Sequence, residues 1–300
     1  MPDNNTLSYT GRFAPSPTGP VHFGTLVAAV GSYLQAKINN GKWLLRMEDV
    51  DTTRKVEGAD TDILHTLEAF GFEWHGEIIY QSKQTEYYQQ VLDTLISQSL
   101  VFPCTCSRKQ LAETNSKIYP GTCRRRHLPE KKQHALRILA QDINIGFVDK
   151  VMGKQSQNIK TQCGDFVIQR RDGLFAYQLA VVADDALQSI TEVVRGADLL
   201  DSTARQIYLQ QCLHYPSPDY CHLPLVVDAN GAKISKSAGA ARVTIKNRQE
   251  LLVAALAFLG QQPPTEINNS DITDIWRWAI AHWRVDRVPH QTNPAFTSHL

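Results

Sequence analysis

Hydrophobic positions in the first hundred residues change between two spacings. The short stretch at 8–14 fits a strand, and so does 42–47 with its apolar centre at 43–45. From 26 to 34, by contrast, apolar residues recur every four residues, which is the spacing of one helix face. Helical spacing returns at 56–70 and 84–97. Strands that alternate with helices in this order are typical of a parallel sheet with crossover connections.

The same alternation returns in the second half of the chain. The later elements that it predicts are a helix at 177–187, a strand at 190–194, a helix at 202–213, a strand at 223–227, and helices at 249–259 and 272–283. The middle of the chain, 101–171, departs from this pattern because it combines clustered cysteines with short strand-like pieces.

These patterns predict an α/β protein whose Rossmann-type parallel sheet is interrupted by one insertion. We expect four segments, namely the first half of the α/β domain at 1–100, the insertion at 101–171, the second half at 172–241 and a helical C-terminal region at 242–300. A chain of 300 residues is long enough to bury a sizeable core in this arrangement.

Composition narrows the functional classes. The chain is 42% hydrophobic and 20% charged, has no apolar run of membrane-spanning length, and begins without the pattern of a signal peptide, so we expect a cytoplasmic protein with no membrane partner. The net charge of +1 gives no overall basic field, so any RNA contact needs a local patch. The run from Arg124 to His127, near Lys131 and Lys132, fits such a patch and equally fits a solvated surface.

The loop 15–25 joins the first predicted strand to the first predicted helix. Open parallel sheets bind ligands at the carboxyl ends of their strands, and a helix N-terminus suits a phosphate group. His22 can hydrogen-bond a phosphate oxygen, and Gly24 lets a nucleotide base approach the backbone closely. Considered alone, a loop rich in proline and glycine fits a simple helix cap equally well.

A second candidate loop has the sequence Lys-Ile-Ser-Lys-Ser and contains Lys233 and Lys236. Two lysines separated by a small polar residue can bind a polyphosphate as point charges. An isolated loop of this composition is usually solvated. Its position after a late strand of the α/β pattern is what favours phosphate binding.

Three of the six cysteines, Cys104, Cys106 and Cys123, lie close together in the sequence. Clustered cysteines in a cytoplasmic chain indicate metal binding rather than disulfides, and zinc takes four ligands of this kind. Spacing leaves the fourth ligand open, because Tyr119 and His127 each lie four residues from Cys123. The remaining cysteines are expected in the core.

The two loops together resemble those of the class I aminoacyl-tRNA synthetases. The stretches Arg-Phe-Ala-Pro-Ser-Pro-Thr-Gly at 12–19, Leu-Arg-Met-Glu-Asp-Val-Asp at 45–51 and Val-Arg-Gly-Ala-Asp at 194–198 resemble the glutamyl branch in particular. The resemblance extends over nearly the whole chain and implies an ATP-dependent ligase that activates L-glutamate.

The resemblance also implies the residues of the amino-acid pocket. Arg12 and Arg195 would bind the two carboxylates of glutamate, since a guanidinium pairs with a carboxylate through two parallel hydrogen bonds. Glu48 would face the ammonium group, and Tyr177 would hydrogen-bond the substrate. The pocket would also be lined by Phe13, Ala14, Pro15 and Ser16.

For ATP, the resemblance implies binding by His22, Gly24, Thr25, Lys233 and Lys236. His22 and Lys236, with Mg²⁺, would stabilise the charge that builds on the phosphates. Members of the family usually end the first motif with a second histidine, whereas this chain has Thr25. A hydroxyl group can still donate to a phosphate oxygen but carries no charge.

Truncated members of the family resemble this chain in two further respects. Their zinc ligands are Cys, Cys, Tyr and Cys, which implies Zn²⁺ bound by Cys104, Cys106, Tyr119 and Cys123. Little chain follows Ser237, so we expect no anticodon-binding domain. We separately expect a monomer. These relatives transfer glutamate to the queuosine base of tRNA(Asp), and the resemblance therefore implies that tRNA as a partner.

Other functions remain open at this stage. A minimal synthetase that charges the 3′ end of tRNA(Glu) fits the same motifs. Thr25 favours a non-catalytic paralogue that binds glutamate or RNA, although the lysine loop argues against it. A small-molecule nucleotidyltransferase shares the histidine–glycine loop, but the two pocket arginines disfavour that class.

Overall fold

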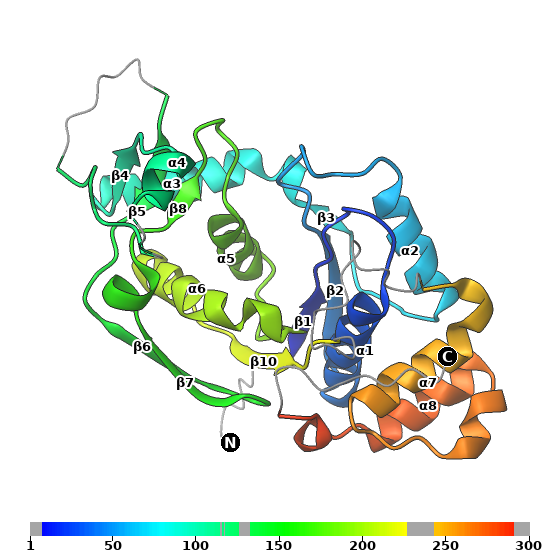
Figure 1. Cartoon of the computed structure of the whole chain (residues 1–300). Helices are drawn as coiled ribbons and strands as arrows, with labels where there is room; N and C mark the ends of the chain where they lie inside the picture. The colour runs from blue at the N-terminus through cyan, green and yellow to red at the C-terminus, as the bar shows by residue number, and fades with distance from the viewer. Residues whose placement is uncertain (1–7, 115, 117, 126–132, 227–242, 291–300) are drawn as a thin grey trace, which may run out of the picture.

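The fold is a twisted, largely parallel sheet with helices on both faces (Figure 1), seen in a computed structural model. The structure describes residues 8–114, 116, 118–125, 133–226 and 243–290. Its strands are β1 (Thr10–Phe13), β2 (Lys42–Met47), β3 (Ile79–Tyr80), β4 (Val101–Cys104), β5 (Ala135–Ile138), β6 (Asn144–Asp149), β7 (Gly153–Asn158), β8 (Val167–Gln169), β9 (Glu192–Gly196) and β10 (Asp219–Leu223). Its helices are α1 (Phe23–Ile38), α2 (Ala59–Ala69), α3 (Thr85–Ser97), α4 (Arg108–Ala112), α5 (Tyr177–Leu187), α6 (Leu200–Leu213), α7 (Arg248–Phe258) and α8 (Ile272–His282). None of these helices is long and apolar enough to cross a bilayer.

The central strands form two groups, parallel except for β7, that meet at β1 and β9. One group has the order β1-β2-β3, and the other has the order β7-β6-β10-β9. The groups meet where the backbone N–H of Thr191, just before β9, donates to the carbonyl oxygen of Thr10 in β1 at 2.9 Å. Strand order therefore reverses between β1 and β9, which is where open α/β sheets bind ligands.

Strand alternation gives the sheet a separate core on each face. On β9, Val194 packs with α1, α7 and α8, whereas its neighbour Val193 packs with α3, α5 and α6. On β10, Leu223 and Tyr220 divide between the same two cores. Successive side chains of a strand point to opposite faces, so a buried sheet needs this double covering.

The segment between the two halves of the sheet contributes two different structures. Strands β4, β5 and β8 form a small antiparallel sheet, which lies at the opposite end of the molecule from α7 and α8 (Figure 1). The β6–β7 hairpin instead extends the main sheet, because β6 runs parallel to β10 with Asp149 opposite Tyr220. Part of the middle segment is thus continuous with the central sheet.

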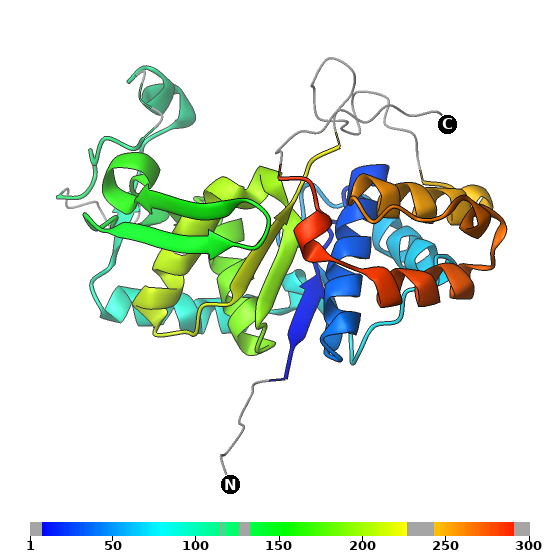
Figure 2. The ribbon, with the colours of Figure 1, turned by 90° about the horizontal axis from the view of Figure 1, so that it is seen from below.

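Helices α7 and α8 pack beside α1 (Figure 2). Two indole N–H groups connect these C-terminal helices to the N-terminal half of the chain. Trp276 donates to the carbonyl oxygen of Phe70 at 2.8 Å, and Trp283 donates to Gln35 Oε1 at 2.9 Å. Both tryptophans are buried, so the C-terminal helices belong to the α1-side core.

Most elements predicted from the sequence are confirmed within a few residues. The strand expected at 223–227 is wrong, since β10 spans Asp219–Leu223. Proline has no N–H to donate in a ladder, so Pro224 ends the pairing of β10 with β9. The prediction followed the apolar residues on both sides of Pro224, whereas the strand itself lies before this proline.

A buried charged residue on β2 contacts α5. Arg46 is fully buried on β2, on the face that α5 covers. Its Nη2 donates to Asp185 Oδ1 at 2.7 Å, its Nη1 donates to Gln188 Oε1 at 2.6 Å, and its Nε lies 3.6 Å from Asp184 Oδ2. A buried charge persists only when it is paired and hydrogen-bonded, so these contacts tie β2 to α5.

Replacing Arg46 with leucine would leave two buried carboxylates without their shared cation. We expect the Arg46→Leu change to lower the free energy of unfolding by about 3–5 kcal/mol, measured by urea denaturation. Arg284→Ala, which removes an exposed pair with Asp286, serves as the control and should have no measurable effect. Equal stability of the two variants would show that the buried network does not hold β2 to α5.

Candidate active site at the strand reversal

A pocket of about 250 Å³ opens at the carboxyl ends of β1, β2, β9 and β10. Its walls come from the loop after β1, the start of α1, the end of β2 and the residues after β9 and β10. The pocket therefore lies at the strand reversal, as expected for this topology.

The structure brings the residues predicted for glutamate and ATP together in this pocket, with the exception of the lysine loop. The predicted residues that line it are Arg12, Phe13, Ala14, Pro15, Ser16, His22, Gly24, Thr25, Glu48, Tyr177 and Arg195. Lys233 and Lys236 lie outside the described residues. Their roles in binding stay predictions.

Arg12 lies in β1 and is 3% exposed. Its Nε donates to Asp185 Oδ1 at 3.1 Å, and its two terminal nitrogens have no acceptor among the described residues. Burial alone would raise the pKa of Asp185, but the charges of Arg12 and Arg46 outweigh it and hold this pKa below its usual value. Asp185 thus stays ionised and anchors one edge of the Arg12 guanidinium.

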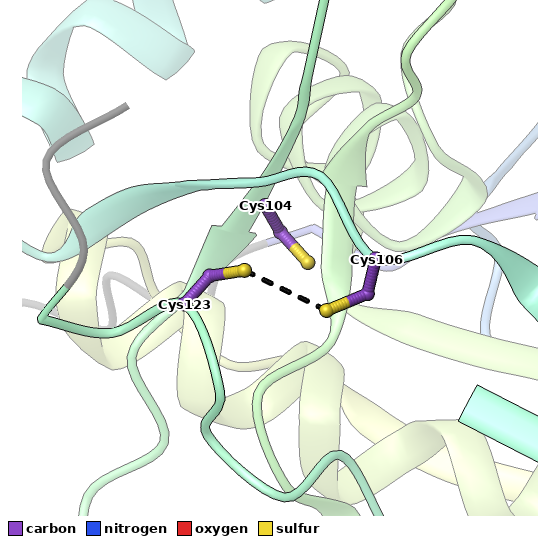
Figure 3. A group of neighbouring side chains, drawn as sticks. All are labelled: Cys104, Cys106 and Cys123. Carbon is purple, nitrogen blue, oxygen red and sulfur yellow. Dashed lines mark hydrogen bonds between the residues drawn. The ribbon is translucent and has the colours of Figure 1, made fainter. Parts of the chain in front are cut away.

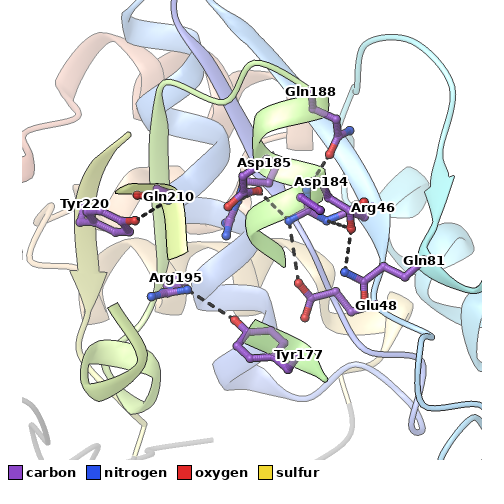
Figure 4. Close-up of polar contacts among 12 residues, drawn as sticks. Arg46, Glu48, Gln81, Tyr177, Asp184, Asp185, Gln188, Arg195, Gln210 and Tyr220 are labelled. Carbon is purple, nitrogen blue, oxygen red and sulfur yellow. Dashed lines mark hydrogen bonds and ion pairs between the residues drawn. The ribbon is translucent and has the colours of Figure 1, made fainter. Parts of the chain in front are cut away.

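Arg195, at the end of β9, is held from several sides. Its Nε donates to His222 Nε2 at 3.0 Å, and its Nη2 donates to Thr203 Oγ1 at 2.9 Å and to the carbonyl oxygen of Leu199 at 3.3 Å. Its Nη1 donates to the Tyr177 hydroxyl at 3.4 Å (Figure 4). The Nε–Nη2 edge therefore faces the protein, and Nη1 is the nitrogen with an N–H left for a ligand.

Glu48 follows directly after β2 and lies between the pocket and Arg46 (Figure 4). Its Oε1 is 3.9 Å from Arg46 Nη2. Burial raises the pKa of Glu48 to about 7, and the nearby charges of Arg46 and Arg12 only partly oppose this rise. A carboxyl group that titrates near neutral pH can accept a cation when it loses its proton.

The first turn of α1 forms the other end of the pocket. His22 is the N-cap, where its Nδ1 accepts from the Thr25 backbone N–H at 3.3 Å and its Nε2 lies 3.0 Å from Thr25 Oγ1. A Cβ added at Gly24 would meet His22 and Val226 only at ordinary contact distances of 3.4 Å or more. Packing within the protein therefore does not require glycine at position 24. The absence of a side chain there leaves space beside the backbone that a ligand could occupy.

Sequence reasoning did not assign the acids beneath the pocket. Asp184 and Asp185 on α5 and Asp149 on β6 are buried, and each pairs with a residue far away in the sequence. Asp184 accepts from the hydroxyl of Tyr88 and from Gln81, and burial raises its pKa. The available signal was the adjacent acid pair within an otherwise apolar helix.

The three clustered cysteines meet in the small antiparallel sheet region (Figure 3). Their sulfur atoms lie within 4.8 Å of one another, with Cys106 Sγ 3.5 Å from Cys123 Sγ. The Tyr119 hydroxyl lies 3.4 Å from Cys104 Sγ and 3.8 Å from Cys106 Sγ. Burial acts to raise the pKa of Cys123, but hydrogen bonds, that of Tyr119 first, lower it to about 7.

This donor set fits a zinc ion, since three thiols and a phenol converge from separate segments. The alternative fourth ligand, His127, lies outside the described residues, as do Arg126, Lys131 and Lys132. Of the basic run, Arg124 forms a two-point pair with Asp165 at 2.6 and 2.7 Å, so its charge is engaged within the protein.

Comparison with known proteins agrees with this geometry. The family model for the catalytic domain of class I tRNA synthetases (E and Q) matches residues 9–263. A glutamyl-Q tRNA(Asp) synthetase from Aromatoleum aromaticum is 49% identical over 97% of this chain and 94% of its own. One from Dechloromonas aromatica is 50% identical over 95% of this chain and 97% of its own.

Solved structures show the same fold. The glutamate-tRNA synthetase from Elizabethkingia anophelis superposes with a TM-score of 0.81 at 25% identity and covers 97% of this chain, which in turn spans 68% of that protein. A glutamate tRNA ligase from Elizabethkingia meningosepticum, solved in complex with its amino acid, gives 0.80. The chain belongs to the class I tRNA synthetases for glutamate and glutamine, and within them to the glutamyl-Q tRNA(Asp) synthetases.

Proposed function

We propose that this protein activates L-glutamate with ATP to glutamyl-adenylate and transfers the glutamate to the queuosine base of tRNA(Asp). The observation that carries the proposal is the single pocket that joins two buried arginines, Glu48 and the N-terminus of α1. Near-complete matches to glutamyl-Q tRNA(Asp) synthetases support the acceptor.

Glutamate presents two carboxylates and one ammonium group to this pocket. Arg12 offers its terminal nitrogens to one carboxylate, and Nη1 of Arg195 offers an N–H to the other, assisted by the Tyr177 hydroxyl. Glu48 accepts the ammonium once it is ionised. Two arginines and one carboxyl group that titrates near pH 7 thus match the two carboxylates and the ammonium group of free glutamate.

The first step joins glutamate to the nucleotide. The α-carboxylate oxygen attacks the α-phosphorus of ATP, and the bond to the pyrophosphate oxygen breaks. The Thr25 hydroxyl, oriented by His22, and the backbone N–H groups at the N-terminus of α1 donate to phosphate oxygens, and ATP brings Mg²⁺ to offset their charge. We assign Lys233 and Lys236 to the same phosphates.

The second step releases AMP when a hydroxyl group of the queuosine base attacks the glutamyl carbonyl carbon. Its proton leaves with the departing phosphate oxygen or through water. Holding both reactants in one pocket supplies much of the acceleration, so no side-chain nucleophile is required. No cysteine is among the described residues that line the pocket.

The insertion at 101–171 would hold Zn²⁺ through Cys104, Cys106, Tyr119 and Cys123. Four protein ligands leave no open position, so the ion would fix the fold of the insertion and take no part in catalysis. We further propose that this segment contacts the acceptor RNA.

The proposed activity is tested first by glutamate-dependent exchange of pyrophosphate into ATP without RNA, and then by transfer of labelled glutamate. We expect exchange without RNA, transfer to queuosine-containing tRNA(Asp), and no transfer to the same tRNA with unmodified guanosine. Arg195→Ala should abolish exchange, whereas Arg284→Ala should not. Charging of tRNA(Glu) instead would indicate a minimal synthetase, and no exchange with any RNA would indicate a binding-only protein.

The pKa of Glu48 predicts a pH dependence. Below about pH 7 this carboxyl gains a proton and no longer pairs with the substrate ammonium, so kcat/KM for glutamate should fall with an inflection near pH 7. The measurement is pyrophosphate exchange at saturating ATP from pH 6 to 8.5. Glu48→Gln should raise KM at high pH and remove the inflection; an unchanged profile in this variant would assign the titration to another group.

The zinc assignment predicts one zinc ion in each purified chain, measured by mass spectrometry of the metal. Cys123→Ser should release the ion because it removes a thiolate ligand, and Cys212→Ser, on α6, should retain it. Tyr119→Phe and His127→Ala distinguish the fourth ligand. Zinc loss in the histidine variant alone would contradict the tyrosine assignment.

A further inference from the structure

Three buried residues from neighbouring strands form a line that ends at the pocket. Asp149 ends β6, His222 lies in β10, and Arg195 lies in β9. In the parallel register, His222 is directly opposite Arg195, and Asp149 is opposite Tyr220. All three side chains are less than 10% exposed, so water does not compete for their contacts.

Hydrogen bonds determine the tautomer of His222. Asp149 Oδ1 accepts backbone N–H groups of Val151 at 3.0 Å and Met152 at 2.8 Å, and Oδ2 lies 2.6 Å from His222 Nδ1. Since a carboxylate can only accept, Nδ1 carries the proton and Nε2 is left as an acceptor. Burial lowers the pKa of His222, and the charge of Arg195 lowers it further, which favours this neutral ring.

The acceptor on His222 fixes the plane of the Arg195 guanidinium. Nε2 of His222 accepts from Arg195 Nε at 3.0 Å, while the Thr203 hydroxyl and the Leu199 carbonyl occupy Nη2. Rotation of the guanidinium would break these bonds together. Nη1 is therefore held toward Tyr177 and the pocket.

We propose that Asp149 and His222 are positioning residues that orient Arg195 for the glutamate carboxylate, an inference that rests on the proposed function. The imidazole separates the Asp149 charge from Arg195, so the arginine is oriented by a neutral acceptor and keeps its positive charge for the substrate. Arg12, by contrast, contacts the Asp185 carboxylate directly. The two pocket arginines are thus supported differently.

Asp149→Asn tests the orientation without changing shape. Oδ1 accepts the backbone N–H groups of Val151 and Met152, whereas the only backbone donor to Oδ2 among the described residues is the His222 N–H, which Oδ1 shares. The amide nitrogen is therefore expected at Oδ2, facing His222 Nδ1. His222 must then carry its proton on Nε2, which turns an N–H against Arg195 Nε–H. We expect KM for glutamate to rise roughly tenfold to a hundredfold, with KM for ATP nearly unchanged, as for loss of a hydrogen bond to a charged group.

Two changes at His222 supply the matched comparison. Gln can donate to Asp149 and accept from Arg195 through one amide, so His222→Gln should keep KM for glutamate close to wild type. His222→Leu keeps the bulk, removes both contacts, and should behave like Asp149→Asn. Thermal unfolding of each variant shows whether the fold is retained.

The outcomes separate this inference from the proposed function. If Arg195→Ala removes glutamate activation but Asp149→Asn and His222→Leu leave KM for glutamate unchanged, the positioning role is wrong and the pocket stands. Equal rises in KM for ATP and glutamate with a lowered Tm would also overturn it, since they indicate a structural role only. An Arg195→Ala variant with unchanged activation would overturn both.

Discussion

The placement of charge inside the sheet is the constraint on which the rest of this structure depends. Arg12, Arg46 and Arg195 lie on strands that are covered on both faces, where an unpaired cation would be prohibitively costly. Each is matched by a buried acceptor from α5 or β10, at distances of 2.7 to 3.1 Å. The pairs of Arg12 and Arg46 join β1 and β2 to α5, and the pair of Arg195 joins β9 to β10, so the contacts that hold the fold also shape the pocket.

The same constraint explains why the acids of the site titrate differently. Asp185 contacts two arginines and stays ionised, whereas Glu48 lies 3.9 Å from its nearest cation and has its pKa raised to about 7 by burial. A pocket with all its cations already paired would bind an anionic amino acid poorly. Under the proposed function, the weakly paired Glu48 would be available for the ammonium group, and the arginines would keep hydrogen-bond donors for the carboxylates.

Local patterns predicted the elements well and the support of the site poorly. The helices at Phe23–Ile38 and Tyr177–Leu187 follow from apolar spacing. The residues of the amino-acid pocket were implied by the resemblance to the glutamyl synthetases. Asp149 and His222 are 73 positions apart and meet only because β6 pairs with β10. No local spacing encodes that pairing, so the acid–histidine contact required the folded sheet. Pro224 ends β10 because it has no backbone N–H, and the apolar residues that follow it led to the wrong strand boundaries.

The threonine in the first motif can be understood in the same terms. Because His22 Nδ1 accepts the Thr25 N–H, a neutral His22 carries its proton on Nε2, which faces Thr25 Oγ1 at 3.0 Å. The Thr25 hydroxyl then accepts from the ring and keeps its own O–H to donate to a phosphate oxygen. Compared with a second histidine, this arrangement gives up a potential positive charge and retains a hydrogen-bond donor. Under the proposed function, the exchange would weaken electrostatic attraction to the phosphates without removing directional contacts, and more of the charge compensation would fall to Lys233, Lys236 and the metal that accompanies ATP.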